Sequence, residues 1–237
     1  MARFSKVAFA IAASAALATA AAPAAAPAGA TTPTQPTVLT IGASRTINYG
    51  QIITVGTTAY NVTTPVPGVT VYLLGRSHNT GQFTLITSRV TDAHGNAAVH
   101  VAPQAFREYF WDYLSPNHAV NVASPAEVVS VAQVVSVHTT ATSVKVNQNF
   151  ELYGGTSPNE PGQIVHAQWL NGVTWTTVGT TAKLVKTKLP NGTTAIGYIF
   201  ILSQSTASTI QWRTYRTPLI PNGLAAGYSP IVTVTSS

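Results

Sequence analysis

A four-residue sequence occurs twice in close succession near the middle of this 237-residue chain. Val-Val-Ser-Val occupies residues 128–131 and again 134–137, with only Ala132-Gln133 between the copies. Short runs of β-branched residues are typical of strands. We therefore expect the first copy to be the last strand of one domain and the second copy to be the first strand of the next. A joint of two residues would couple the two domains stiffly.

Before this joint, turn signals recur at near-regular spacing and separate about seven short strand patterns. Ile53, Val55 and Thr57 alternate with polar or small residues, which indicates a half-buried strand. The dipeptide Pro67-Gly68 predicts a turn, because proline fixes φ and glycine accepts positive φ. Only residues 103–107 suggest a helical turn. The pattern predicts an all-β sandwich.

The second half of the chain repeats these signals in the same order. The matched pairs are Gly50 with Asn147, Gly68 with Gly162, Phe83 with Trp175, Gly95 with Gly192, Trp111 with Trp212, and Ser124 with Ser229. Replacing glycine with asparagine is conservative for the backbone, since these two residues best tolerate positive φ. We predict a diverged tandem repeat, with one domain at residues 37–132 and a second at 133–237.

The residues that repeat also resemble a known family. The Pro-Gly turn before an alternating strand, the segment Thr91-Asp92-Ala93-His94-Gly95 and the aromatic strand after it are similar to the bacterial immunoglobulin-like repeats of exported and cell-surface proteins. The resemblance covers both halves and implies two tandem immunoglobulin-like β-sandwich domains. It implies a spacer, adhesion or interaction module and supplies no catalytic residues. The chain departs from the antibody-type variant because it has no cysteine pair.

The first 30 residues are typical of a secretory signal peptide. Arg3 and Lys6 precede an uncharged stretch rich in alanine, and Ala28 and Ala30 fit the small residues of an A-x-A cleavage site. Cleavage after Ala20 or Ala21 is the alternative. Residues 31–36 are rich in Thr and Pro and predict a short disordered lead-in.

A retained membrane anchor is the rival interpretation of this leader. The stretch is mostly alanine and is broken by Pro23 and Pro27, so it is a weak membrane span. We therefore expect no stable membrane insertion after removal of the signal. The predicted location is secreted and extracellular, or associated with the cell wall, and the alanine-rich leader indicates a bacterial protein.

Composition excludes several classes of function. Without cysteine there is no disulfide framework, so each domain must depend on a packed core. Without Arg3 and Lys6, ten basic and six acidic residues remain, a net charge of +4. This balance permits loose attraction to anionic cell-surface polymers but is too small and too scattered for nucleic-acid binding.

No group of residues predicts catalysis. The six acidic residues are isolated in sequence, which disfavours paired-carboxylate chemistry. Asp92 and His94 could be imagined in a triad, but no Ser lies in a G-x-S-x-G elbow, and Asp-Ala-His-Gly is an ordinary β-turn sequence. The histidines lack metal-ligand spacing. We expect no enzyme activity, no metal and no cofactor.

The aromatic residues divide into two groups. Tyr109, Trp111 and Tyr113 fall on one face of a strand, and we predict that Trp111 and Trp212 point into the core. Trp169 and Trp175 flank the hairpin sequence Asn171-Gly172. These two tryptophans are the candidate ligand-binding residues, as a platform on which sugars could stack.

The sequence therefore predicts a non-enzymatic exported protein that acts as an extracellular or cell-surface interaction or structural module of the adhesion type. The alternative is a carbohydrate-binding module. A secreted enzyme of an unrecognised type is a third class, with no residues in its favour. The expected partner is an unidentified protein or a cell-wall polysaccharide.

Overall fold

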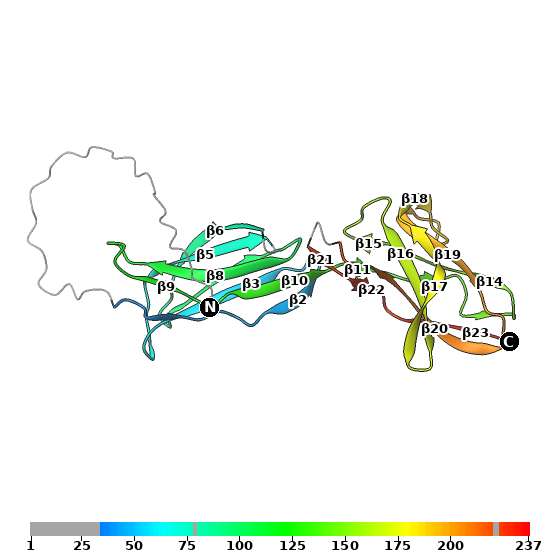
Figure 1. The fold of residues 1–237 in the computed structure, drawn as a ribbon, viewed down its shortest axis with the longest axis horizontal. Coiled ribbons are helices and arrows are strands. Elements are labelled where there is room, and N and C mark those ends of the chain that lie inside the picture. The colour runs from blue at the N-terminus through cyan, green and yellow to red at the C-terminus, as the bar shows by residue number, and fades with distance from the viewer. Residues whose placement is uncertain (1–33, 78–79, 220–222) are drawn as a thin grey trace, which may run out of the picture. The chain divides into compact units, whose positions relative to one another are not determined.

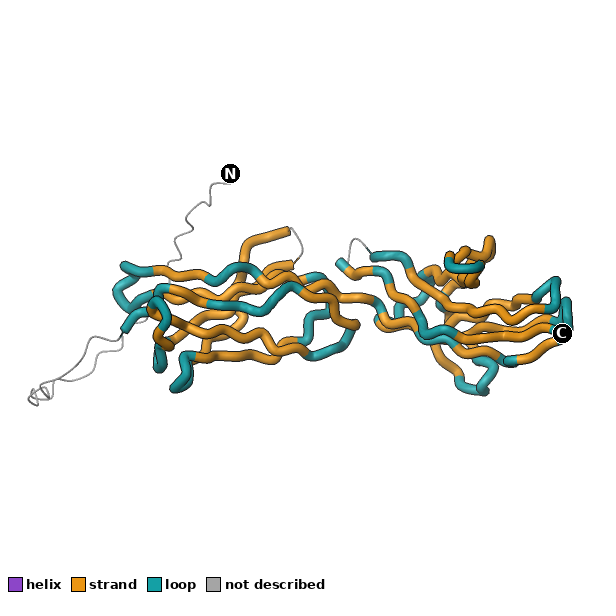
Figure 2. The backbone as a smooth tube through the Cα atoms, turned by 90° about the horizontal axis from the view of Figure 1, so that it is seen from below, coloured by secondary structure: helices purple, strands orange, loops and turns teal. Residues whose placement is uncertain are grey.

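The computed structural model describes residues 34–77, 80–219 and 223–237, and every regular element in this part of the chain is a β-strand (Figures 1 and 2). The predicted signal peptide, with Ala28 and Ala30, lies outside the described residues, as does the start of the lead-in. Within the described residues, no helix has the length and apolarity needed to cross a membrane.

The strands of the N-terminal half, residues 34–132, form two sheets. They are β1 (Val38–Leu39), β2 (Arg45–Asn48), β3 (Ile53–Asn61), β4 (Thr64–Pro65), β5 (Thr70–Ser77), β6 (Thr80–Val90), β7 (Asn96–Val101), β8 (Arg107–Leu114), β9 (Asn121–Ala123) and β10 (Glu127–Ala132). One sheet has the order β1-β3-β4, with β7 also paired to β3. The other has the order β2-β10-β8-β5-β6, with β9 paired to β8.

The strands of the C-terminal half, residues 133–237, pair in a similar way. They are β11 (Val134–Val135), β12 (His138–Thr139), β13 (Ser143–Val144), β14 (Asn149–Gly154), β15 (Thr156–Ser157), β16 (Ile164–Asn171), β17 (Thr174–Lys183), β18 (Val185–Lys188), β19 (Thr194–Ser203), β20 (Ser208–Arg216), β21 (Leu224–Ala225), β22 (Gly227–Tyr228) and β23 (Val232–Ser236). The two larger sheets are β12-β14-β19-β18 and β13-β23-β20-β16-β17, with β22 paired to β20.

Each half contains the same unusual pairing, in which a short early strand runs parallel to a late strand. β2 pairs with β10 in the N-terminal half, and β13 pairs with β23 in the C-terminal half, both in parallel. Apart from a parallel pairing of β21 with β10, the other pairings in these sheets are antiparallel, for example β5 with β8 and β16 with β20. This order resembles that of immunoglobulin-type sandwiches, in which the two sheets enclose a core.

Two clusters of buried apolar side chains fill the two halves. Tyr109, Trp111 and Tyr113 are buried in the first cluster, and Trp212 is buried in the second beside Phe150. The predictions that Trp111 and Trp212 point inward are confirmed. Aromatic side chains of this size contribute the largest single areas to a core, which makes them the anchors of each cluster.

Several predicted turns have matching geometry in the two halves. Gly50 and Asn147 both have positive φ, at 83° and 62°, as the glycine-to-asparagine match predicted. Beside them, the Gln51 and Gln148 side chains accept hydrogen bonds from backbone amides three residues earlier, at 3.2 and 2.9 Å. The tandem duplication itself stays a prediction that these turns support.

One matched pair is shifted by two residues. The Ser124 Oγ accepts a hydrogen bond from the Trp111 amide at 2.9 Å, and the Ser229 Oγ accepts one from the Thr214 amide at 2.8 Å. In this pattern the counterpart of Trp111 is Thr214 and not Trp212. The predicted match of Trp111 with Trp212 was wrong because it paired two tryptophans by residue type, whereas the backbone register pairs Trp111 with Thr214.

The helical turn expected at residues 103–107 is also wrong. The segment contains a bend at residues 104–105, and β8 begins at Arg107. The amide of Phe106 donates to the carbonyl of Gly223 at 2.8 Å, so this backbone group bonds outside its own segment. A helix would require those backbone bonds within the segment.

Leu224 belongs to the C-terminal half in sequence but is buried in the first apolar cluster. Its strand β21 pairs in parallel with β10, where Leu224 lies opposite Val131. The side chain of the buried Gln133 donates to the carbonyls of Thr217 and Ala225, at 2.8 and 3.1 Å. The short joint is therefore held by side-chain bonds as well as by its length.

Replacing Ser124 with alanine should lower the free energy of unfolding by about 1–3 kcal/mol, because the Trp111 amide would lose its side-chain acceptor inside the core. Equilibrium unfolding in urea would measure the change. Ser88→Ala, on strand β6, is the control and should change stability by less than about 0.5 kcal/mol. Equal effects of the two variants would contradict a special role for Ser124.

Candidate functional site

The carboxylate of Asp92 is held within a turn of the N-terminal half. Asp92 Oδ1 accepts hydrogen bonds from the backbone amides of His94 and Asn96, at 2.8 and 2.9 Å. These two bonds lower the pKa of Asp92 below its ordinary value. The Gly95 amide also donates to the Asp92 carbonyl at 2.9 Å, which closes the predicted β-turn. No group of three His, Cys, Asp or Glu side chains capable of holding a metal occurs in the described part of the chain.

The two candidate tryptophans lie on opposite faces of one sheet. In β16, Val165, Ala167 and Trp169 point toward the second apolar cluster, and Trp169 packs against it. Trp175 lies opposite Leu170 in the β16–β17 hairpin, and therefore on the outer face. Both indoles are half-buried. The structure does not bring them together, so they cannot form one stacking platform.

Trp175 instead belongs to a network of side chains on the outer face of β16, β17, β20 and β22. We call this surface the aromatic face, and it consists of His166, Gln168, Trp175, Arg213, Tyr215 and Tyr228. Figure 1 shows these four strands in the C-terminal half.

Local structure explains why these side chains share a face. The two-residue loop Gly172-Val173 closes the hairpin, with Gly172 at a φ of 61°, and this register sets Trp175 opposite Leu170. Arg213 and Tyr215 are alternate residues of β20 and so point the same way. β22 adds Tyr228 directly opposite Tyr215.

The contacts within the aromatic face are continuous. The Arg213 guanidinium lies 4.1 Å from the centre of the Trp175 ring and 4.6 Å from that of Tyr228. Tyr228 stacks on Tyr215 with centroids 5.7 Å apart, and Tyr215 stacks on His166 at 4.9 Å. Such contacts order the rings. Tyr228 is 53% exposed, and the other rings are half-buried.

Hydrogen bonds fix the cation at the middle of this network. Arg213 Nε donates to Gln168 Oε1 at 2.8 Å, and Gln168 Nε2 donates to Thr177 Oγ1 at 3.1 Å. No hydrogen bond joins the two terminal nitrogens of Arg213 to any described residue. A guanidinium held in this way can donate its free N–H groups to an acceptor outside the protein.

Sequence reasoning identified Trp175 but missed Arg213, Tyr215 and Tyr228. In the sequence, the alternation of Gln211 and Arg213 around Trp212 indicates only that this side of the strand faces solvent. The available signal was that Arg213 and Tyr215 share this side. Tyr228 could not be found from sequence, because β22 has two residues and its pairing with β20 depends on the chain path after Arg216.

Trp169 lines a different feature, a shallow groove of about 480 Å³ at the opening between the sheets of the C-terminal half. The groove also contacts Val178, Leu202, Gln204 and Trp212. Gln204 is buried and donates to the carbonyl of Val234 at 3.2 Å. Because this lining is largely the margin of the apolar cluster, we assign it to core packing.

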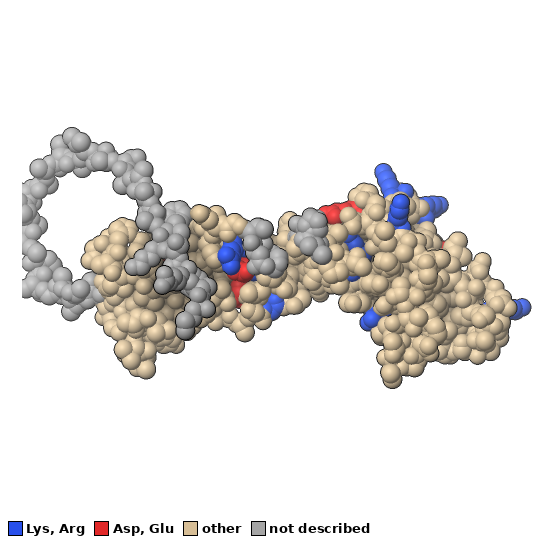
Figure 3. Space-filling view, in the orientation of Figure 1, with Lys and Arg blue, Asp and Glu red and all other residues tan. Residues whose placement is uncertain are grey.

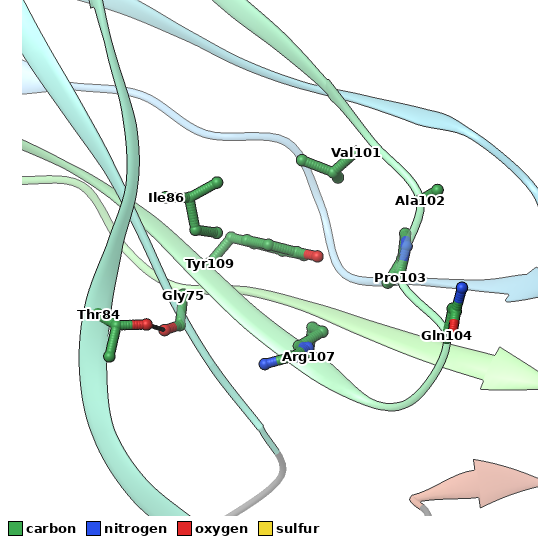
Figure 4. A pocket seen from close by; sticks show the side chains of 9 residues that line it. All are labelled: Gly75, Thr84, Ile86, Val101, Ala102, Pro103, Gln104, Arg107 and Tyr109. Carbon is green, nitrogen blue, oxygen red and sulfur yellow. Dashed lines mark hydrogen bonds between the residues drawn. The ribbon is translucent and has the colours of Figure 1, made fainter.

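A second groove, of about 520 Å³, opens in the N-terminal half (Figure 4). Ile86 is the extra residue of a β-bulge in β6, since Leu73 pairs with Thr87 and Leu74 with Leu85. A β-carbon at Gly75 would lie 2.6 Å from Ile86 Cδ1, so glycine allows Ile86 to cover this strand. The Tyr109 ring also lines this groove, and burial raises the pKa of its hydroxyl.

Charged side chains are sparse on the face shown in Figure 3. In the N-terminal half, two basic side chains are paired with acids: Arg45 with Glu127 at 2.8 Å and Arg76 with Glu108 at 2.6 Å. Arg213 has no such partner among the described residues and contacts aromatic rings instead.

No protein-family model matches the chain, and the search of curated proteins found no match. Among solved structures, the D0–D1 domain of intimin is similar with a TM-score of 0.32 and 14% sequence identity, over 84% of this chain and 98% of that chain. A TM-score this low supports no conclusion about fold or function.

Proposed function

We propose that this chain is a non-enzymatic, exported interaction module and that it engages its partner through the aromatic face. The observation that carries this proposal is the linked set of accessible rings around Arg213. Exposed aromatic and arginine side chains are enriched where proteins bind partners. The predicted signal peptide at residues 1–30 and the resemblance to bacterial immunoglobulin-like repeats support an extracellular or cell-wall location.

The proposal includes the predicted organisation into two immunoglobulin-like domains, at residues 37–132 and 133–237. The two apolar clusters and the parallel pairings β2–β10 and β13–β23 support this division. In this organisation the C-terminal domain binds the partner. The N-terminal domain acts as a spacer. Its ring contacts among the described residues are the smaller set of Phe83 and Phe110 with Arg76, whose guanidinium is already paired with Glu108.

Carbohydrate is the partner that the aromatic face fits best. Three rings, those of Trp175, Tyr215 and Tyr228, lie on one sheet face beside amide and hydroxyl groups. Sugar rings present apolar C–H faces that pack on aromatic side chains, and their hydroxyls bond to neighbouring polar groups. This arrangement favours the carbohydrate-binding form of the function over a purely structural spacer.

Combining Trp175→Ala with Tyr228→Ala should reduce binding of the full chain to isolated bacterial envelope polysaccharide by at least about tenfold, because two ring contacts are lost together. Co-sedimentation with the insoluble polysaccharide measures the effect. Tyr72→Ala is the matched control, because Tyr72 is a half-buried, outward-facing aromatic residue of β5 in the other half. Unchanged binding by the double variant would overturn the proposed site.

A further inference from the structure

We propose that the aromatic face binds an acidic polysaccharide, one whose pyranose rings carry carboxylate groups. This inference rests on the proposed function, since it concerns the same surface, and it names the class of ligand. It depends on three observations: the distribution of charge, the composition of the outer face and the geometry of Arg213.

The positive charge of the chain is concentrated in one half. Residues 133–237 contain six Lys or Arg and two Asp or Glu, whereas residues 37–132 contain four of each kind. The net charge of +4 after the leader therefore belongs entirely to the C-terminal half. The C-terminal half therefore attracts anions, whereas the N-terminal half, which has no net charge, does not.

Neither acid of the C-terminal half lies on the aromatic face. Glu151 is in β14, which belongs to the opposite sheet, and Glu160 lies near Arg216, whose positive charge it supports. The outward positions of β16, β17, β20 and β22 hold aromatic, neutral polar, aliphatic and basic side chains only. Lys183, opposite Ile164, places a second cation on this face. A ligand carboxylate would meet no fixed negative charge there.

Arg213 has the geometry to recognise a carboxylate. Its guanidinium is held near the Trp175 and Tyr228 rings and by the bond from Nε to Gln168, so its orientation is set before any ligand arrives. The free terminal N–H groups can donate two parallel hydrogen bonds to the two oxygens of a carboxylate. Because the side chain is already ordered, little conformational entropy is lost on binding.

The aromatic rings of this face favour binding of a pyranose polymer over binding of other anionic polymers. Flexible phosphodiester polymers of glycerol or ribitol lack the flat sugar ring that would pack on Tyr228 and Tyr215. Single-stranded nucleic acid requires a basic groove that follows the backbone. The aromatic face provides only Arg213 and Lys183, which suits a polymer with widely spaced charges.

The test compares two polymers with the same sugar backbone, one with free carboxylates and one with methyl-esterified carboxyl groups. Affinity electrophoresis of the full chain in gels with polygalacturonate should show a dissociation constant at least about tenfold lower than in gels with fully methyl-esterified polygalacturonate. Raising the salt concentration should weaken the first interaction and leave the second unchanged. Poly(glycerol phosphate) and single-stranded DNA are run in parallel and should not bind more tightly than the ester.

Two substitutions assign the effect to the site. Arg213→Gln should weaken binding to polygalacturonate at least about tenfold, and by a clearly larger factor than it weakens binding to the ester, because it removes the fork that contacts the carboxylate. Arg213→Lys keeps the charge without the fork and should give an intermediate loss. Arg89→Gln, which removes one cation from β6, is the control and should bind normally. Thermal unfolding of each variant verifies that it is folded.

The outcomes separate this inference from the function on which it rests. Equal binding of the ester and the acid would overturn the acidic ligand and leave a carbohydrate-binding face intact. Tighter binding of poly(glycerol phosphate) or DNA through Arg213 would overturn the pyranose polymer. If neither galacturonate polymer binds, the inference fails, and the envelope test with the Trp175 and Tyr228 variants then decides the proposed function separately.

Discussion

Replacing Trp111 with alanine should lower the free energy of unfolding by about 3–5 kcal/mol, out of the roughly 5–15 kcal/mol typical of a domain. Trp111 is completely buried and lies opposite Leu73 in the pairing of β5 with β8. Its removal would leave a large cavity between the two sheets, and a closely packed β-sandwich cannot collapse to fill such a cavity. Urea unfolding followed by circular dichroism measures the loss.

Trp111→Phe is the graded control, because it keeps an aromatic ring in the same place and should cost clearly less than the alanine variant. Val173→Ala, at a hairpin position that is 97% exposed, should cost less than about 0.5 kcal/mol. A loss below about 1 kcal/mol for Trp111→Ala would mean that the indole does not anchor the first cluster.

Replacing Gly154 with alanine should cost about 3 kcal/mol, at the upper end of the range for overpacking. A β-carbon at this position would overlap the carbonyl oxygen of Ser136 and lie 2.9 Å from the Tyr198 hydroxyl. That hydroxyl donates to the same Ser136 carbonyl and lies 2.6 Å from Thr214 Oγ1. The methyl group would therefore disturb a buried polar network, which is more costly than an apolar clash.

Gly179→Ala is the matched control, since no atom lies within 4 Å of a β-carbon there and its φ needs no glycine. Its stability should change by less than about 0.5 kcal/mol. Urea unfolding of both variants provides the comparison. If the two substitutions had similar effects, the close approach of Gly154 to Ser136 would not be a constraint on the fold.

The sequence predicted the strands well where the side chains alternate. Ile53, Val55 and Thr57 are buried along one face of β3 as expected, because a half-buried strand shows its period directly in the sequence. The segment at 103–107 was mispredicted because its backbone bonds to Gly223, more than one hundred residues away. Local patterns contain no information about such partners.

The candidate site was only partly predictable for a similar reason. The hairpin sequence Asn171-Gly172 identified the strands that carry Trp169 and Trp175, and the hairpin is present. Strand alternation alone could have separated the two indoles, since they fall on opposite faces once the hairpin register is fixed. The contacts of Arg213 with Trp175 and Tyr228 join three strands and required the three-dimensional arrangement.

The burial of Leu224 among residues of the N-terminal half limits how the protein can be divided or recombined. A fragment that stops at Ala132 would lose the side chain that pairs opposite Val131 and would expose apolar surface in its place. Exchanging either half for an unrelated module would remove the same contact. The two halves are therefore not interchangeable cassettes, and any chimaera must still supply the packing of Leu219 and Leu224 against the N-terminal half.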